Sequence, residues 1–364
     1  MNADRKDSVY IIAEAGVNHN GSPKLARDLV DVAAAAGADA VKFQSFRTDD
    51  LVSQSAPRAA YQADNLGGSE TQREMLRKLE LSFDDQRGVA AHAAKAGIEF
   101  LSTPFDLASL DFLVRDLGLS RIKLGSGDLT NAPLLLAAAR TGRDVILSSG
   151  MASLDETLTA LGVLAFGYTA GPSDSPTQAA FGRAWDSERA RSAVTTHVTL
   201  LHCTSEYPTP PADVNLRAMD ALREATGLRV GLSDHTDGIA IPIAAAARGA
   251  VVIEKHFTLD RTMTGPDHRA SIEPDELKQL VKGVRDVERA LGTGVKAPMA
   301  GEFSTRAVAR RSLVAGTSIR VGEVFSAENL LVKRPGTGVA PILYWEYLGR
   351  VATRDYAQDE LIDP

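Results

Sequence analysis

The sequence predicts an α/β protein in which a (β/α)8 barrel is followed by a small β-rich domain. Short β-branched runs alternate with Ala- and Leu-rich segments over most of the chain, which is the pattern of parallel strands joined by helices. From residue 312 onward, short strand-like runs and turn residues replace the helical periodicity, which indicates a separate β-rich unit. We therefore expect a barrel domain over 1–292, a linker over 293–311 and a second domain over 312–364.

Eight short runs are expected to be the strands of the barrel. They lie at 9–14, 39–44, 98–103, 121–126, 144–149, 198–203, 229–234 and 250–255. Helical stretches are expected at 23–36, 84–96, 106–117, 132–141 and 273–292. Eight such units over roughly 290 residues fit a TIM barrel. A doubly wound open sheet is the alternative, but EAGVNHNG follows the first strand in place of a glycine-rich phosphate turn.

Two segments interrupt this repeat. Residues 45–83 form a long polar stretch after the second strand, and residues 166–197 are inserted before the sixth. The second segment is expected to be partly helical and to decorate the surface of the barrel without forming a domain.

Composition and charge narrow the classes of function. The 364-residue chain is 44% hydrophobic and 24% charged, as globular proteins are. Its formal net charge of −7 argues against a nucleic-acid binder, which needs a basic face. Cys203 is the only cysteine, which excludes a disulfide within the chain and a cysteine-rich metal site. The apolar run near the N-terminus is too short for a signal peptide or a membrane span, so we expect a cytoplasmic protein without a membrane partner.

Polar or ionisable residues follow nearly every expected strand. In a (β/α)8 barrel the carboxyl ends of all eight strands meet at one face, which carries the active site. We therefore expect one shared site there. The strand-end residues are Glu14, Lys42, Gln44, Ser102, Thr103, Lys123, Ser126, Ser149, His202, Thr204, Asp234, His235, Glu254, Lys255 and His256.

Two histidines, His235 and His256, come just after neighbouring strands. Because adjacent parallel strands lie about 4.8 Å apart, both imidazoles can reach one ion. Two histidines completed by water and substrate oxygens suit a divalent cation, and we expect Mn²⁺, with Mg²⁺ or Co²⁺ as alternatives. In the competing interpretation each histidine only caps its strand or binds a carbonyl oxygen. Glu254 either supports His256 or points the other way.

An anion site is expected at the ends of the second and fourth strands, where Lys42 and Lys123 supply positive charge. Ser126 and Ser149 lie in GSGD and SSGM turns, whose small residues let backbone N–H groups approach a phosphate or a carboxylate. In the alternative interpretation the lysines are simply solvated.

Four carboxylates near the same rim are candidates for proton transfer or for orienting a ligand. They are Glu14, Asp128, Asp234 and Asp267. The residue pattern does not rank them. His202 lies within an apolar strand, and we expect it to be a hydrogen-bonded core histidine.

At these motifs the chain resembles the sialic acid synthase family, whose members condense phosphoenolpyruvate with an N-acetylated hexose to form nine-carbon keto sugar acids. The resembling segments run in order along nearly the whole chain: IIAEAGVNHNG, AVKFQSF, FLSTPFD, IKLGSGDLTNAPLL, ILSSGM, LLHCTSEYPTP, GLSDHT, VIEKHFTLDR and GPDHRAS. The C-terminal segments RRSLVA and GEVFSAENLLVKRPGTG resemble the antifreeze-like (SAF, β-clip) domain that such synthases carry. Legionaminic acid synthases are close relatives within this resemblance.

The resemblance implies roles for individual residues. His235 and His256 match two ligands of a divalent metal, and Glu14 and Asp267 match carboxylates near the reacting centre and the sugar hydroxyls. The positions that match phosphoenolpyruvate-binding residues are Lys42, Lys123, Ser126 and Ser149, with Thr103 and Ser233 close by. The positions that match the lining of the sugar pocket are Tyr207, Gln44 and Phe105.

The resemblance also implies a homodimer. Arg311, in ARRS, matches an arginine that reaches from the small domain into the barrel of the partner subunit, over the N-acetyl group of the sugar. A domain-swapped homodimer with shared sites is therefore expected.

The chain departs from the family pattern at two positions, of which the second bears on the acceptor sugar. Asp128 stands where many bacterial members have Glu, and Ser205 stands where members of the sialic acid type often have Asn. The first expectation is an N-acetylneuraminate synthase acting on an acceptor of the N-acetylmannosamine type. The alternative is N,N'-diacetyllegionaminate or pseudaminate synthesis from a 2,4-diacetamido-6-deoxyhexose. A metal-dependent barrel hydrolase and a non-catalytic sugar-binding protein are more remote alternatives.

Overall fold

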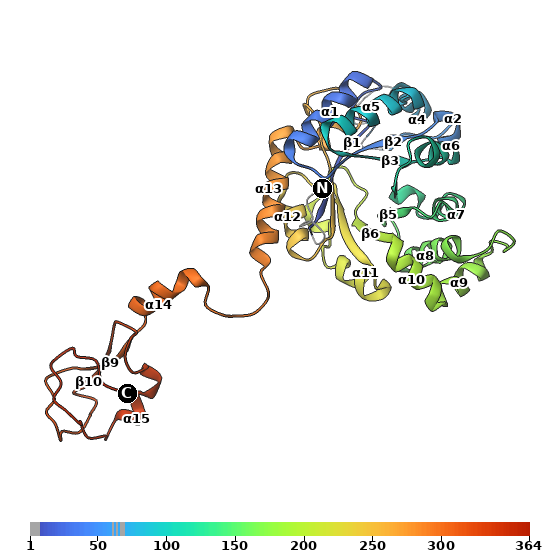
Figure 1. Cartoon of the computed structure of the whole chain (residues 1–364). Coiled ribbons are helices and arrows are strands. Elements are labelled where there is room, and N and C mark those ends of the chain that lie inside the picture. Colours follow the sequence, from blue (N-terminus) through green and yellow to red (C-terminus); the bar gives the residue numbers. More distant parts are fainter. Residues whose placement is uncertain (1–7, 60–61, 63–64, 66–69) are drawn as a thin grey trace. The chain divides into compact units, whose positions relative to one another are not determined.

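A computed structural model describes residues 8–59, 62, 65 and 70–364 of the chain (Figure 1). The chain divides into two compact units, Met1–Gly292 and Thr293–Pro364. The first holds an eight-stranded parallel sheet surrounded by helices, and the second a small antiparallel sheet. The predicted fold class is confirmed.

The eight strands of the first unit follow the order β3-β2-β1-β8-β7-β6-β5-β4. The two strands at the ends of this order, β3 and β4, lie against each other and close the barrel. Every expected strand is present, with its ends within two residues of the predicted ones. The strands are β1 Tyr10–Gly16, β2 Ala40–Ser45, β3 Glu99–Pro104, β4 Arg121–Leu124, β5 Asp144–Ser148, β6 Val198–Cys203, β7 Arg229–Asp234 and β8 Val252–His256.

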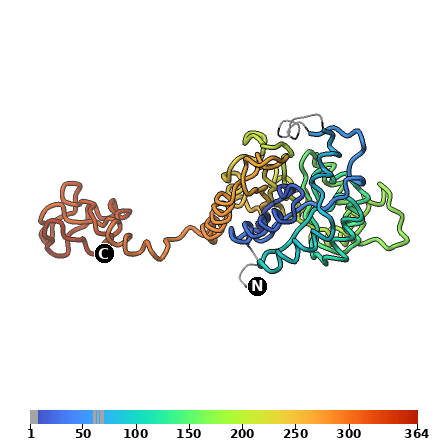
Figure 2. Tube along the Cα trace, turned by 90° about the horizontal axis from the view of Figure 1, so that it is seen from above, coloured from blue at the N-terminus to red at the C-terminus, as the bar shows by residue number. Residues whose placement is uncertain are grey.

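Helices form the outer layer of the barrel, and Figure 2 shows it from above. The first helix, α1 (blue), lies between α5 and α13 (orange) in both views. The helices of this unit are α1 Pro23–Ala36, α2 Thr48–Leu51, α4 Gln72–Leu79, α5 Phe83–Ala96, α6 Leu107–Asp111, α7 Ala132–Arg140, α8 Leu154–Thr169, α9 Gln178–Asp186, α10 Glu188–His197, α11 Ala218–Thr226, α12 Ala240–Ala247 and α13 Pro274–Leu291.

Local sequence signals set the ends of these helices, as α1 illustrates. The Ser22 hydroxyl accepts a hydrogen bond from the Leu25 N–H (3.3 Å), which satisfies a donor that the start of a helix leaves unpaired. Pro23 is tolerated in the first turn because its missing N–H would have had no partner there. Gly37 ends the helix with φ 83°, a left-handed conformation that favours glycine. The chain therefore turns back toward the sheet at this point and enters β2.

The inserted segment before β6 forms α9 and α10, which pack on α8. Phe166 and Phe181 meet edge to face with ring centroids 5.4 Å apart. At Gly162 a Cβ atom would lie 2.8 Å from the Phe181 carbonyl oxygen, so the close approach of these helices requires glycine there. The insert thickens the outer layer of the barrel, as predicted.

Two layers of side chains fill the interior of the barrel. The lower layer is apolar and buried, and consists of Ile12, Ala40, Leu101, Ile146, Leu201 and Val252. Because side chains alternate along a strand, the residues two positions further on also point inward. This upper layer is polar, and consists of Glu14, Lys42, Thr103, Ser148, Cys203 and Glu254. The lower layer is thus an apolar floor beneath a polar layer at the carboxyl ends of the strands.

The second unit begins at Thr293, and its first α-helix is α14 Phe303–Ala309, so part of the predicted linker is helical. Its sheet pairs β9 Ser312–Ala315 with β10 Leu330–Lys333 in antiparallel fashion, and α15 Tyr344–Tyr347 follows. The buried core of this unit includes Leu313, Ile319, Phe325, Leu330, Tyr347 and Tyr356. None of the helices in the described part of the chain combines the length and hydrophobicity needed to cross a membrane.

Candidate active site

A cavity of about 420 Å³ lies above the polar layer of the barrel, at the carboxyl ends of the strands. It brings together most of the residues that the sequence analysis selected. The selected residues that line it are Glu14, Lys42, Gln44, Thr103, Phe105, Lys123, Ser126, Tyr207, Ser233, His235 and His256.

Asp128 and Ser149 do not line this cavity. The Asp128 carboxylate accepts a hydrogen bond from Nδ2 of Asn131 (2.9 Å), which holds the turn before α7. The Ser149 hydroxyl donates to the carbonyl oxygen of Leu201 (2.9 Å) and ties the end of β5 to β6. Both side chains are therefore engaged in the scaffold that supports the strand ends.

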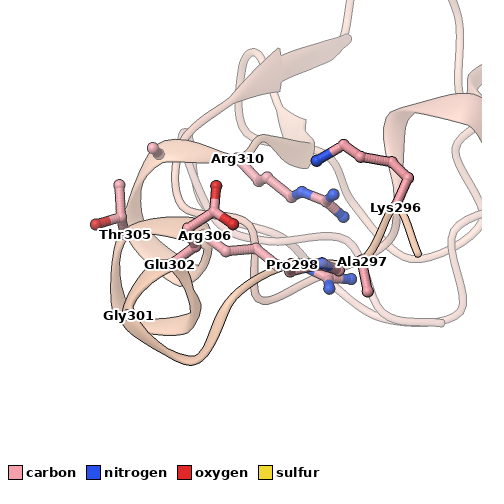
Figure 3. A pocket seen from close by; sticks show the side chains of 9 residues that line it. Lys296, Ala297, Pro298, Gly301, Glu302, Thr305, Arg306 and Arg310 are labelled. Carbon is pink, nitrogen blue, oxygen red and sulfur yellow. The ribbon is translucent and has the colours of Figure 1, made fainter. Parts of the chain in front are cut away.

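Asp267 does not line the cavity either, and Arg311 belongs to the other unit. Asp267 is buried in the loop after β8, and burial raises the pKa of its carboxyl to about 6. Arg311 belongs to the second unit, where it is exposed and follows α14. Its neighbour in the sequence, Arg310, lines a hollow of about 470 Å³. Figure 3 shows the cationic side chains of Lys296, Arg306 and Arg310 at this hollow. The start of the second unit thus carries a cluster of positive charge.

Lys42 and Lys123 enter the polar layer from β2 and β4, and Glu254 of β8 lies between them. Each ammonium nitrogen is 3.6 Å from a different oxygen of the Glu254 carboxylate. Lys42 is also 2.8 Å from Oε2 of Glu14. The alternation of side chains along β8 also sets the direction in which Glu254 points. Glu254 stands two positions before His256 and therefore shares its inward face.

Hydroxyl groups complete the surroundings of both ammonium groups. Lys42 donates to Oγ1 of Thr103 (3.1 Å), and Lys123 donates to Oγ of Ser148 (2.7 Å). Hydroxyls satisfy these donors without cancelling the positive charge. Two fixed cations in a desolvated layer can therefore hold an anion strongly.

The two buried carboxylates differ in acidity. Burial raises the pKa of Glu14, although the neighbouring Lys42 opposes the shift. Burial acts in the same direction on Glu254, but Lys123 and Lys42 outweigh it and lower the pKa of this carboxyl. Ser233 also donates a hydrogen bond to Glu254 (2.7 Å). Glu254 is thus a fixed negative charge, whereas Glu14 can exchange a proton near neutral pH.

His235 and His256 face each other at the ends of β7 and β8, with ring centroids 5.4 Å apart. The Tyr207 ring lies 4.1 Å from the His235 ring and 5.8 Å from the His256 ring. Nδ1 of His235 is 2.8 Å from the carbonyl oxygen of Thr204, which can only accept. This contact assigns a proton to Nδ1, so in the neutral ring Nε2 carries the lone pair for a ligand.

The histidine pair fits a divalent cation with open coordination positions. Nδ1 of His256 is buried and has no hydrogen-bond partner among the described residues. Burial lowers the pKa of His256 well below its usual value, so the ring is neutral and can act as a ligand. Within the described ranges, no cluster of three or more His, Cys, Asp or Glu is placed to hold a metal. A cation held by His235 and His256 would therefore complete its shell with water or substrate oxygens, as catalytic ions do.

The polar segment after β2 also contributes to the cavity. Ala59, Gln62 and Gln72 line it, and none of the three was predicted from the sequence. The position of the segment could have predicted this contribution, because loops that follow barrel strands build the active-site face.

His202 belongs to the scaffold. Its Nε2 lies 2.6 Å from the carbonyl oxygen of Val214, and the ring is half-buried. The expectation of a hydrogen-bonded histidine is confirmed.

Comparison with known proteins agrees with this geometry. The model of the NeuB family matches residues 29–296, and that of the SAF domain matches residues 310–364. The chain belongs to the NeuB family. Its relatives include the N,N'-diacetyllegionaminic acid synthase of Campylobacter jejuni, which is 46% identical over 352 residues, or 97% of this chain and 98% of that protein.

Two further NeuB comparisons extend this result. The N,N'-diacetyllegionaminic acid synthase of Legionella pneumophila is 45% identical over 332 residues, or 91% of this chain and 87% of that protein. A crystal structure of N-acetylneuraminic acid (sialic acid) synthetase from Leptospira borgpetersenii serovar Hardjo-bovis matches with a TM-score of 0.64 and 34% identity. It covers 82% of this chain and 90% of that one. The predicted family and the SAF domain are confirmed, and this NeuB protein is an enzyme of the transferase class.

Proposed function

We propose that this NeuB protein is an N,N'-diacetyllegionaminate synthase, which condenses phosphoenolpyruvate with a 2,4-diacetamido-6-deoxyhexose and water. The observation that carries the proposal is 46% identity, over 97% of the chain, to the Campylobacter jejuni enzyme of that name. Identity to the Leptospira sialic acid synthetase is 34%. The comparisons thus favour the alternative over the first expectation, an acceptor of the N-acetylmannosamine type.

The lysine side of the cavity is suited to phosphoenolpyruvate, which carries a phosphate and a carboxylate. Lys42 and Lys123 supply two buried positive charges, and Thr103 and Ser126 supply hydroxyls at the same wall. In a layer that excludes water, these groups attract the anion and hold its C3 atom toward the cavity. Glu254 limits the excess of positive charge when the site is empty.

The proposed reaction forms one carbon–carbon bond and releases phosphate. C3 of phosphoenolpyruvate bonds to the aldehyde carbon of the open-chain sugar, water adds at C2, and the bond between C2 and the phosphate oxygen breaks. The water oxygen becomes the C2 keto oxygen and loses both of its protons; the aldehyde oxygen gains one and the departing phosphate takes the other. Glu14 is the proposed group for this proton transfer, because it lies 2.8 Å from Lys42 and burial raises its pKa.

The histidine side is suited to the acceptor. His235 and His256 would hold a divalent cation, Mn²⁺ in this proposal with Mg²⁺ or Co²⁺ as alternatives. Such an ion supplies Lewis acidity toward the aldehyde oxygen. Tyr207, Gln44 and Phe105 line the remaining wall and would contact the sugar.

We also propose that the active form is a homodimer in which Arg311 of one copy serves the barrel of the other. The support is the apolar surface at the start of the second unit. Val295, Met299, Phe303 and Val308 are 56–71% exposed, and exposed apolar side chains of this density favour a protein interface. Light scattering on the purified full chain tests the dimer, and a monomer at micromolar concentration contradicts it.

The test of the reaction is phosphate release from phosphoenolpyruvate in the presence of Mn²⁺. The acceptors are a 2,4-diacetamido-6-deoxyhexose of the manno type and N-acetylmannosamine. The proposal requires release with the first and a much lower rate with the second. The reverse result would make the chain an N-acetylneuraminate synthase, which the likeness to the Leptospira structure supports as second candidate. No release with either sugar, from a folded and metal-loaded protein, contradicts both.

A further inference from the structure

A buried ion pair lies behind the two histidines. Nζ of Lys255 is 2.6 Å from Oδ2 of Asp234, and both side chains are 1% exposed. In the sequence Asp234 directly precedes His235, and Lys255 directly precedes His256. Because side chains alternate along a strand, the pair occupies the side opposite to the cavity. One buried contact therefore connects the two chain segments that carry the histidines.

The same contact fixes the turn around His235. The hydroxyl and the N–H of Thr236 donate to the two oxygens of the Asp234 carboxylate (3.0 and 3.2 Å). Lys255 donates to the carbonyl oxygen of Thr236 as well. Lys255, the residue before His256, thus contacts the residues on both sides of His235, which are Asp234 and Thr236.

The turn around His235 also anchors the segment that carries Tyr207. The N–H of Thr209 donates to the carbonyl oxygen of His235 (2.8 Å), and Thr209 bridges to Thr236. At the other end of the segment, Thr204 accepts from the His235 ring (2.8 Å). The tyrosine ring is therefore placed by contacts that depend on the turn.

We infer that Asp234 and Lys255 are a positioning pair, which holds His235 and His256 at the spacing needed to share one cation and keeps Tyr207 beside them. The inference rests on the proposed cation site of the two histidines. A contribution to stability alone explains the pair poorly, because a buried ion pair is often no more stabilising than apolar residues of the same shape.

The inference predicts that loss of the pair affects the histidine side of the cavity and not the lysine side. Lys42 and Lys123 come from β2 and β4, and their bonding partners are Glu14, Thr103, Ser148 and Glu254. Loss of the positioning pair should therefore weaken cation binding and leave phosphoenolpyruvate binding intact. A general loosening of the barrel would weaken both.

The test uses the double variant Asp234→Asn/Lys255→Met, which removes both charges together and leaves no lone buried charge. The matched control is Asp39→Asn/Arg285→Met, which removes an ion pair of 2.6 Å at the amino end of β2. Circular dichroism first establishes that each variant is folded. Mn²⁺ dissociation constants are then measured by electron paramagnetic resonance, and phosphoenolpyruvate dissociation constants by calorimetry in the presence of a chelator.

The expected result is a 10- to 100-fold loss of Mn²⁺ affinity, the range seen when groups that orient metal ligands are changed. Phosphoenolpyruvate affinity should change less than about twofold, and the control should match the wild type in both. Unchanged Mn²⁺ affinity in the double variant overturns the positioning role, and so does an equal loss for both ligands. If the wild-type protein binds no Mn²⁺, the result contradicts the proposed cation site and, with it, the inference.

Two single variants keep the test decisive if the double variant fails to fold. Asp234→Asn retains an acceptor for Lys255 and Thr236, and should show the same split with a smaller loss. Lys255→Arg retains the charge and should lose at most half as much Mn²⁺ affinity as Asp234→Asn, on a logarithmic scale. Failure of both expectations overturns the inference.

Discussion

The two sides of the cavity differ in how far their polar groups are satisfied by the protein itself. On the lysine side, both ammonium groups have hydroxyl and carboxylate partners within 2.7–3.6 Å. On the histidine side, Nδ1 of His256 is buried without a partner among the described residues, and the same residues offer no cluster of three His, Cys, Asp or Glu that could hold a metal. The first side is pre-organised, whereas the second is completed by what binds there.

This difference predicts which step of the reaction a substitution on each side should affect. Substitutions on the lysine side break contacts that exist before any ligand arrives, so they should affect both anion binding and the chemical step. Substitutions on the histidine side should act chiefly through the affinity for the cation and the acceptor.

The largest effect is expected from Lys123→Met. The variant removes one of two buried cations and leaves Glu254 with less compensation, so kcat/KM for phosphoenolpyruvate should fall by about 10³-fold, the scale of a lost charge-stabilising group. Mn²⁺ affinity should change little. Steady-state phosphate release and Mn²⁺ titration measure the two quantities. Lys282→Met, which removes a lysine 76% exposed on α13, is the control. A loss below tenfold would contradict the role of Lys123.

Next in size is a gain of stability on the histidine side from Asp267→Asn. The pKa of Asp267 rises from 3.8 to about 6 on folding, so its ionised form destabilises the folded state by at most about 3 kcal/mol, at 1.36 kcal/mol per unit. The stability contributed by this residue is full below pH 4 and is lost as the pH rises to about 6. Asparagine avoids that loss.

Urea unfolding of the wild type and of the Asp267→Asn variant, at pH 4 and at pH 8, measures this effect. The variant should be more stable at pH 8 and about equal to the wild type at pH 4. Equal stability at both pH values would show that Asp267 is not destabilised by its surroundings. Activity should fall in the variant, because the carboxylate that matches a group near the reacting centre is gone.

A third effect concerns the cation itself. Treatment with EDTA should abolish phosphate release, and Mn²⁺ should restore it. His256→Gln should weaken Mn²⁺ binding by at least about 100-fold, since loss of a ligand exceeds the loss caused by an outer partner. His197→Gln is the control, because His197 lies on α10 and contacts Asp144. Full activity after EDTA treatment would contradict a role of the cation in the mechanism.

The smallest effect is expected at Ser205, which lines the cavity. Ser205→Asn should shift the ratio of kcat/KM values toward N-acetylmannosamine by about fivefold, because one hydrogen bond contributes about 1 kcal/mol. Competition between the two acceptors, followed by mass spectrometry, measures the ratio. A ratio unchanged within a factor of two would show that Ser205 does not read the acceptor.

Much of the site could be predicted from the sequence because it depends on alternation along strands. Lys42, Lys123, His235 and His256 were placed at one face by their positions after strand-like runs, and the structure brings all four to one cavity. Glu254 obeys the same rule, since it shares a face with His256.

The remaining contacts could not be predicted because they depend on turn geometry. Asp128 and Ser149 stand at the right strand ends, but their side chains bond to Asn131 and to the Leu201 carbonyl. A strand period gives no information about a side chain beyond the end of the strand. The lining by Gln62 and Gln72 depends on how a long loop folds back, which has no short-range pattern in the sequence.

The apolar floor of the barrel has a consequence for the order of events in catalysis. Ile12, Leu101 and Leu201 are fully buried beneath the polar layer, so a molecule bound at the lysines can enter and leave only from above. Glu254, beside the lysines, lies one inward position below His256 on the same strand. A sugar at the histidines would therefore block the way to the lysines. Turnover should follow a compulsory sequence, with phosphoenolpyruvate first, and an inert acceptor analogue should inhibit uncompetitively against phosphoenolpyruvate.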